Sequence, residues 1–187
     1  MKIDPVNCKD RMNSENSDAV NPGILRGKVF KFGDDISTDL IAPGRYFHLR
    51  SNLQELARHL LEDADPEFAK KVKPGDFLVG GRNFGLGSSR EHAPTIIKLI
   101  GVGAVLAKSF ARIFFRNSIN VGLPVLICDT DKINDGDELE VDLRKGVVRN
   151  LTRKIEINFN PLPEVMIKIL SDGGLIEHVT KNKGFNL

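Results

Sequence analysis

The sequence predicts an α/β fold in which parallel and antiparallel strands share one domain. In the middle of the chain, short apolar runs alternate with helical patterns, which is typical of parallel pairing. From residue 138 onward polar and apolar residues alternate instead, as in an antiparallel sheet with one exposed face. The chain has 187 residues, of which 41% are hydrophobic and 28% charged, and this is enough for one core.

The N-terminal segment differs in composition from the rest. Residues 1–22 are rich in Asn, Ser, Asp and Lys and show no period, so they are expected to form a disordered or loosely docked tail. Order should begin near Ile24, with a strand over residues 28–32. Residues 23–187 are therefore expected to form a single domain.

The remaining elements are predicted from periodicity and turn residues. A helix over residues 52–62 follows from apolar residues at helical spacing, with Ser51 or Asn52 available as its N-cap. Pro94 is tolerated in the first turn of a helix, so the helix that contains it should begin near His92. The other expected segments are strands at 77–79, 104–107, 124–127, 138–143 and 155–159, and helices at 95–100, 109–119 and 163–170.

Charge and composition exclude several classes of function. Lys and Arg number 27 and Asp and Glu 25, so the net charge of +2 provides no long-range field for nucleic acid or an anionic membrane. The apolar stretches fall short of the roughly 20 residues of a membrane span, and the N-terminus lacks the order of a signal peptide, so cytoplasmic residence is expected. Cys8 and Cys128 indicate neither a disulfide nor a zinc site. An iron–sulfur cluster usually needs three or four thiolates, so no metal is expected to bind this chain.

A glycine-rich segment, residues 82–94, bears most on function. It lies between a buried strand and a helix, where open α/β sheets bind ligands. Gly85 and Gly87 permit positive φ and close approach of the backbone, which predicts an anion pocket. The pattern is not a dinucleotide fingerprint, because Arg90 replaces the third glycine, and it also lacks the features of a P-loop or a nucleophile elbow.

The residues before the helix are candidates for ligand contact. Ser88, Ser89 and Arg90 are expected in the connecting turn, where Arg90 could hold a carboxylate with two hydrogen bonds. The alternative is structural, since Ser88 and Glu91 have the spacing of a capping box.

An earlier loop, residues 33–46, carries three carboxylates and an arginine. Asp34, Asp35 and Asp39 could bind a cation, with Arg45 following them. Their spacing does not match an EF-hand, however, and Asx-turns and caps explain most acids of this kind.

A third segment, residues 108–124, is expected to position a strand and to contact a partner. Phe110, Ile113 and Phe114 belong to the core face of its helix, whereas Arg112 and Arg116 share another face. Three histidines, His48, His59 and His178, have no other candidate catalytic or metal-binding residue at a suitable spacing. They are therefore expected at surface or capping positions.

These three segments together closely resemble the small subunits of 3-isopropylmalate dehydratase and archaeal-type homoaconitase, which are similar to the C-terminal swivelling domain of aconitase. The resemblance covers the chain from about Gly27 to the last predicted helix. It implies a β/β/α three-layer swivelling domain. The implied enzyme is a hydro-lyase of leucine biosynthesis, which interconverts 2- and 3-isopropylmalate by dehydration and rehydration. The chain would act with a large subunit that carries a [4Fe–4S] cluster, in a heterodimer or heterotetramer.

The resemblance also implies roles for individual residues. Ser88 matches the base that removes the proton next to a carboxylate, and Arg90 matches the arginine that binds substrate carboxylate. A serine is a poor base in water, so amides of the glycine loop and Arg90 would have to stabilise its alkoxide. The expected substrate-binding residues are Arg90, Ser89, Gly87, Asp39 and Arg45.

The stretch after the early loop tunes specificity in this family. Here it contains Phe47, His48, Leu49 and Arg50. Phe47 and Leu49 favour an alkyl group, as in isopropylmalate, whereas Arg50 favours a second carboxylate, as in homoaconitate. Citramalate and 2,3-dimethylmalate are further alternatives. The alternative from another class is a non-catalytic module that binds an anion.

Overall fold

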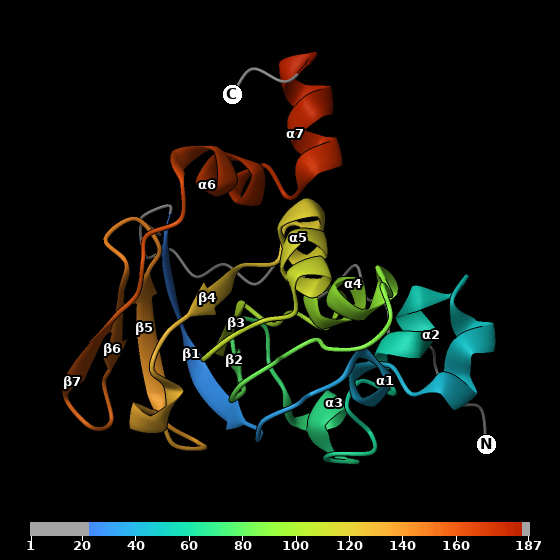
Figure 1. Ribbon diagram of the computed structural model, residues 1–187, viewed down its shortest axis with the longest axis horizontal. Coiled ribbons are helices and arrows are strands. Elements are labelled where there is room, and N and C mark those ends of the chain that lie inside the picture. The colour runs from blue at the N-terminus through green and yellow to red at the C-terminus, as the bar shows by residue number, and fades with distance from the viewer. Residues whose placement is uncertain (1–22, 185–187) are drawn as a thin grey trace, which may run out of the picture.

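A seven-stranded mixed sheet runs through the protein, whose computed structural model describes residues 23–184 (Figure 1). The strands lie in the order β4-β3-β2-β1-β5-β6-β7. Their bounds are β1 Ile24–Lys31, β2 Phe77–Val79, β3 Ala104–Ala107, β4 Val125–Ile127, β5 Glu138–Asp142, β6 Val147–Asn150 and β7 Ile155–Asn158. The strands β1 to β4 pair in parallel, and β1, β5, β6 and β7 pair antiparallel. Both predicted kinds of pairing are confirmed.

Strand β1 joins the two halves of the sheet. Its residues 24–28 pair with β5, and its residues 29–31 pair with β2. Gly27 lies where the partner changes, and a Cβ there would come within 2.3 Å of the carbonyl oxygen of Gly75. Glycine is therefore required at this position, because the turn before β2 crosses directly over it.

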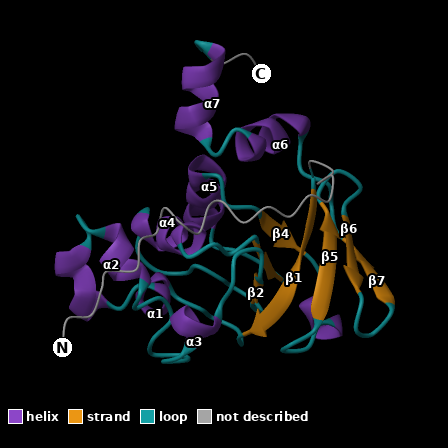
Figure 2. Cartoon of the chain, turned by 180° about the vertical axis from the view of Figure 1, so that it is seen from behind, coloured by secondary structure: helices purple, strands orange, loops and turns teal. Residues whose placement is uncertain are grey.

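The helices flank mainly the parallel half of the sheet. In both views α1 to α5 lie on the side of the parallel strands, β5 to β7 form the opposite side, and α7 extends away from the rest (Figures 1 and 2). The helices are α1 Thr38–Ile41, η1 Gly44–Leu49, α2 Leu53–Ala57, α3 Phe68–Lys71, α4 His92–Leu99, α5 Arg112–Val121, η2 Thr130–Lys132, α6 Glu164–Ser171 and α7 Leu175–Asn182.

The two faces of the parallel strands supply two separate cores. On β2 and β3, Leu78 and Val105 pack with the helices, whereas Phe77 and Leu106 pack with residues of the antiparallel half such as Val148. All five side chains are fully buried. The curled sheet thus forms two layers and the helices a third, which confirms the predicted three-layer architecture.

Two predicted helices have different bounds in the structure. The helix expected over residues 52–62 ends at Ala57, because Leu61 has a φ of 56° and donates its N–H to the carbonyl of Ile41. This turn brings Leu61 into the core. The helix expected from residue 109 begins at Arg112 instead, because Phe110 is extended and bridges to Phe84. Strand β6, the helices α1, α3 and α7, and the 3-10 helices η1 and η2 had no predicted counterpart.

The expectation that Ile113 belongs to the core face of its helix is wrong, because Ile113 is 48% exposed whereas its neighbour Phe114 is buried.

The expectation for His178 is also wrong. Its side chain is buried, and its Nδ1 lies 2.6 Å from a carboxylate oxygen of Asp172, so it belongs to the packing of α6 against α7. Within residues 23–184 no helix is long and apolar enough to cross a membrane. The predicted tail, residues 1–22, lies outside the described residues.

Candidate functional site

The glycine-rich loop after β2 is held between two other loops at the carboxyl edge of the parallel strands. On one side, Gly85 donates its N–H to the carbonyl of Ile36, at 2.7 Å, in the loop after β1. On the other side, Phe84 donates to the carbonyl of Ser109, at 3.0 Å, in the loop after β3. The backbone therefore fixes this loop from both sides, as a preorganised site requires.

The loop glycines are required by close contacts and by positive φ. Gly85 has a φ of 78°, and a Cβ there would lie 2.1 Å from a ring carbon of Phe114. Gly87 has a φ of 109°, and a Cβ there would lie 3.0 Å from the hydroxyl of Thr38. Asn83 also has a positive φ, 57°, and its amide donates to a carboxylate oxygen of Asp35 at 2.8 Å. These conformations bring the loop close to α1 and α5.

Ser88 and Ser89 are exposed in the turn that precedes α4. The carbonyl of Ser88 accepts from the N–H of Arg90, at 2.7 Å, and from the hydroxyl of Thr38, at 3.2 Å. Glu91 is the residue before α4, and no side chain caps this helix. The capping-box alternative is therefore wrong, and within residues 23–184 no hydrogen bond reaches the Ser88 hydroxyl.

Arg90 connects this turn to the loop after β1. Its Nη2 lies 2.6 Å from Oδ1 of Asp39, and its Nη1 donates to the carbonyl of Ala42 at 3.1 Å. The Arg90 side chain is 20% exposed, whereas that of Asp39 is 58% exposed. The structure therefore brings the turn of Ser88 and Arg90 together with the loop of Thr38 and Asp39, and it fixes the Arg90 guanidinium against that loop.

Arg45 points to other partners. Its guanidinium lies 2.8 Å from Asp63 and 3.3 Å from Glu62, and it covers the ring of Tyr46. These contacts raise the pKa of Arg45, and the hydrogen bond from Arg45 lowers the pKa of Asp63. The structure does not join Arg45 to the pair formed by Asp39 and Arg90, and its role in binding substrate stays a prediction.

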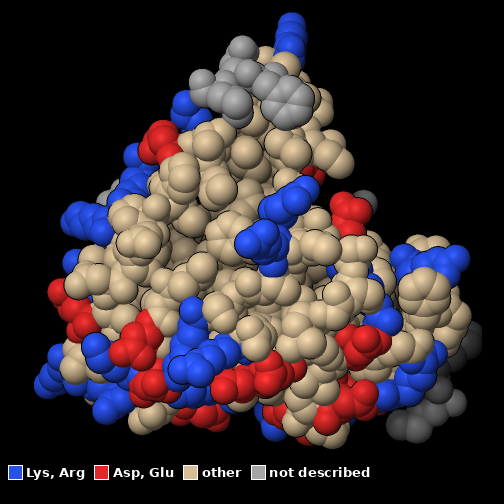
Figure 3. All heavy atoms as spheres, in the orientation of Figure 1, with Lys and Arg blue, Asp and Glu red and all other residues tan. Residues whose placement is uncertain are grey.

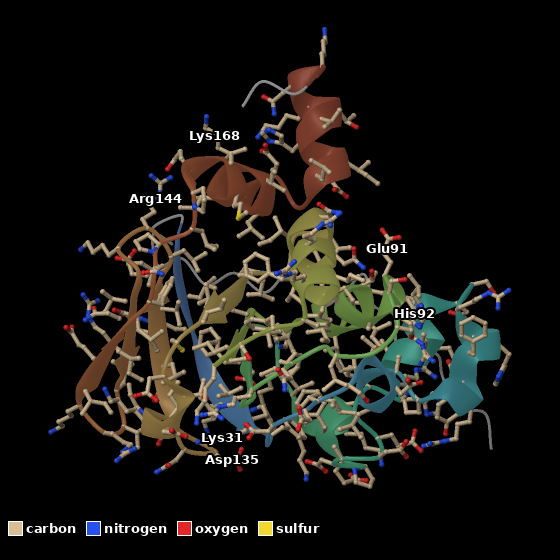
Figure 4. All side chains as sticks on the ribbon, in the orientation of Figure 1. Lys31, Glu91, His92, Asp135, Arg144 and Lys168 are labelled. Carbon is tan, nitrogen blue, oxygen red and sulfur yellow. The ribbon has the colours of Figure 1, made fainter. Side chains whose placement is uncertain are left out.

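Among the expected specificity residues, Phe47 contacts the start of α4, whereas the Nδ1 of His48 lies 3.2 Å from the carbonyl oxygen of Arg45. The guanidinium carbon of Arg50 lies 4.5 Å from the centre of the Phe47 ring, and that ring meets His92 edge-on at 6.2 Å. Burial and the positive charge of Arg90 lower the pKa of His92. Figure 4 labels His92 and Glu91 at the beginning of α4. Sequence reasoning placed a helix start at His92 but missed this contact, since nothing in the spacing indicates it.

The acids of the early loop serve the backbone. Asp34 accepts a hydrogen bond from the N–H of Arg82 at 2.7 Å, and Asp35 holds Asn83. Among residues 23–184 no group of three His, Cys, Asp or Glu could hold a metal. Burial raises the pKa of Cys128 to about 12, and this one thiol falls short of the three or four thiolates that a cluster usually needs. The described residues do not fit an iron–sulfur cluster.

The chain is similar to known proteins of one family. Residues 41–129 match the model of the aconitase C-terminal domain. The chain is 68% identical to 3-isopropylmalate dehydratase small subunit 2 of Archaeoglobus fulgidus, over 83% of this chain and 94% of the relative. It is 54% identical to the methanogen homoaconitase small subunit of Methanothermobacter thermautotrophicus, over 85% of this chain and 92% of the relative.

A solved structure shows the same fold. The crystal structure of 3-isopropylmalate dehydratase from Methanocaldococcus jannaschii is similar with a TM-score of 0.82 and 47% sequence identity. The match covers 86% of this chain and 95% of that one.

Proposed function

We propose, from the premise that the chain belongs to the family of 3-isopropylmalate dehydratase small subunits, that it binds substrate carboxylate and removes a proton in such a dehydratase. One observation carries the proposal. The exposed hydroxyl of Ser88 belongs to the same turn as a guanidinium that Asp39 and the carbonyl of Ala42 hold in place.

The chemistry assigned to this chain is general-base catalysis at a bound carboxylate. Arg90 binds a carboxylate of the hydroxy acid, and Ser88 Oγ takes the proton from the carbon next to it. The electrons of the C–H bond form a double bond as the hydroxyl leaves with its bonding electrons as hydroxide. The proton taken by Ser88 and this hydroxide together make up the water that is lost, and addition of water in the other orientation moves the hydroxyl. Arg90 and the amides around Gly87 stabilise the alkoxide that a serine base requires.

A large subunit completes the site in this proposal. A [4Fe–4S] cluster is assigned to that subunit, where it would supply the Lewis acid for the departing hydroxyl, because the described residues of this chain do not fit one. The isolated chain is therefore expected to be inactive.

Isopropylmalate is the substrate that the specificity residues favour. The charge of Arg50 faces the ring of Phe47, so the pair offers an aromatic surface to an alkyl group. Homoaconitate is the second candidate, because Arg50 is exposed and could turn to a distal carboxylate, and because one relative is a homoaconitase small subunit.

The test is an anaerobic assay of this chain with a cluster-loaded large subunit. The unsaturated acid is followed for isopropylmalate, citramalate, 2,3-dimethylmalate and homocitrate. Turnover of isopropylmalate by the wild type, with at least a ~1,000-fold lower kcat for Ser88→Ala, supports the proposal. Ser171→Ala is the matched control, since Ser171 is exposed in α6. Full turnover by Ser88→Ala would support an anion-binding role in place of the proposed chemistry.

A further inference from the structure

A hollow of about 340 Å³ opens beside the candidate site, between α5 and the end of β4. Its walls are the rings of Phe110 and Phe115, the side chain of Ile127 and two arginines, Arg112 and Arg116. Ile127 is 53% exposed, although it is an apolar residue at the end of an edge strand. An exposed apolar side chain between aromatic rings indicates a surface that another molecule covers.

The two arginines of the hollow lack a counter-charge. Arg112 and Arg116 are both exposed, and within residues 23–184 no carboxylate pairs with either. They share one face of α5 because they are four residues apart. Figure 3 shows basic side chains over α5 within a broad area without charge. The hollow therefore fits an occupant that combines carboxylate and apolar groups.

The hollow and the glycine-rich loop are in direct contact through two aromatic rings. Phe110 lies against Phe84 with ring centres 5.8 Å apart, and Phe84 is in the loop that leads to Ser88. Both belong to the carboxyl edge of the parallel strands. A specific interface covers about 800 Å² on each partner, so a protein that completes the site at Ser88 must also cover neighbouring surface at this edge.

We propose that the hollow at Phe110, Arg112, Phe115, Arg116 and Ile127 receives an acidic and apolar segment of the large subunit. Aromatic residues and arginine are the residue types that supply most binding energy at protein interfaces. Two guanidiniums beside an aromatic floor select a carboxylate that is presented next to an apolar side chain. This inference rests on the proposed function for the existence of the partner, and it assigns the surface that binds it.

The test measures binding and turnover separately. The partner is the cluster-loaded large subunit of a 3-isopropylmalate dehydratase that forms a complex with the wild-type chain. Arg112→Glu combined with Arg116→Glu should raise the dissociation constant at least about tenfold, with kcat at saturating small subunit within about twofold. Ile127→Ser should raise the dissociation constant without changing its salt dependence. The wild-type affinity should fall with salt more steeply than that of the double variant.

The control carries the same change of charge at another place. Arg144 and Lys168 are exposed. Figure 4 shows both toward the upper end of the sheet, away from Lys31 at the end of β1. The hollow lies at the same edge of the sheet as Lys31, because Ile127 also ends a parallel strand. Arg144→Glu combined with Lys168→Glu should leave the dissociation constant unchanged, and thermal unfolding verifies that every variant is folded. Equal affinity of the two double variants would overturn the inference. A wild-type complex without turnover would count against the proposed function, whereas the comparison of affinities would still decide the role of the hollow.

A small carboxylate is the competing occupant. If the isolated chain bound isopropylmalate or leucine through Arg112 and Arg116, and the double variant kept full affinity for the large subunit, the inference would also be overturned.

Discussion

Asp39 Oδ1 lies 2.6 Å from Nη2 of Arg90, although Asp39 follows β1 and Arg90 follows β2. The ion pair exists because parallel strands place their carboxyl ends at one edge of the sheet. Together with the hydrogen bond from Arg90 to the carbonyl of Ala42, it fixes the guanidinium against the loop after β1. Asp39 is thus a positioning residue in the proposed reaction.

Asp39→Asn should weaken substrate binding more than it slows the chemical step. The amide cannot neutralise the guanidinium, so Arg90 is held less firmly. We expect KM to rise about 10-fold or more and kcat to fall only a few-fold, measured on the assembled complex. Asp39→Glu should restore part of the affinity. Equal kinetics of the wild type and Asp39→Asn would contradict the positioning role.

Gly85→Ala should destabilise the fold by about 2–4 kcal/mol, because its Cβ would collide with Phe114 and because its φ is unfavourable for alanine. Gly136 provides a matched control, since it has the same φ of 78° and nothing lies within 4 Å of a Cβ there. Gly136→Ala should cost only the backbone term, about 1–2 kcal/mol. Urea denaturation measures both, and equal losses would show that the contact with Phe114 has no effect.

Asn83 should tolerate glycine better than alanine. Both substitutions remove the hydrogen bond to Asp35, but only glycine adopts a φ of 57° without strain. Asn83→Ala should therefore unfold about 1 kcal/mol more easily than Asn83→Gly. The comparison cancels the lost hydrogen bond, so equal stabilities would mean that the backbone of the loop relaxes freely.

Protonation of His92 should reduce the free energy of unfolding in mild acid. Burial and Arg90 lower its pKa below the ordinary value of 6.5, so the unfolded chain binds the proton more readily than the folded one. The contribution of neutral His92 to the free energy of unfolding is therefore fully present above pH 6.5. It is lost as pH falls toward and through the lower pKa that His92 has in the folded chain. His92→Gln should remove this part of the pH dependence. Urea denaturation between pH 7.5 and 5 tests it, with His48→Gln as the control at an exposed histidine.

Several site features could be predicted from sequence because they are local. The order of glycines, serines and arginine in residues 82–94 indicates a turn that binds an anion, and Pro94 locates the start of α4. The resemblance to the dehydratase small subunits depends on the same residues. The contact between Phe47 and His92 could not be predicted from the sequence, because the distance between these residues depends on the packing of η1 against α4.

The sequence by itself determined the class of fold and most strands, since periodicity and turn residues act within a few residues of each other. Its resemblance to the dehydratase small subunits implied the candidate base, Ser88. Only the tertiary structure decided that Asp39 pairs with Arg90, that Arg45 turns to Glu62 and Asp63, and that His178 is buried. Each of these outcomes depends on which segments the curled sheet brings together. A charged side chain pairs with the opposite charge that packing places close to it, and spacing along the sequence does not predict which charge that is.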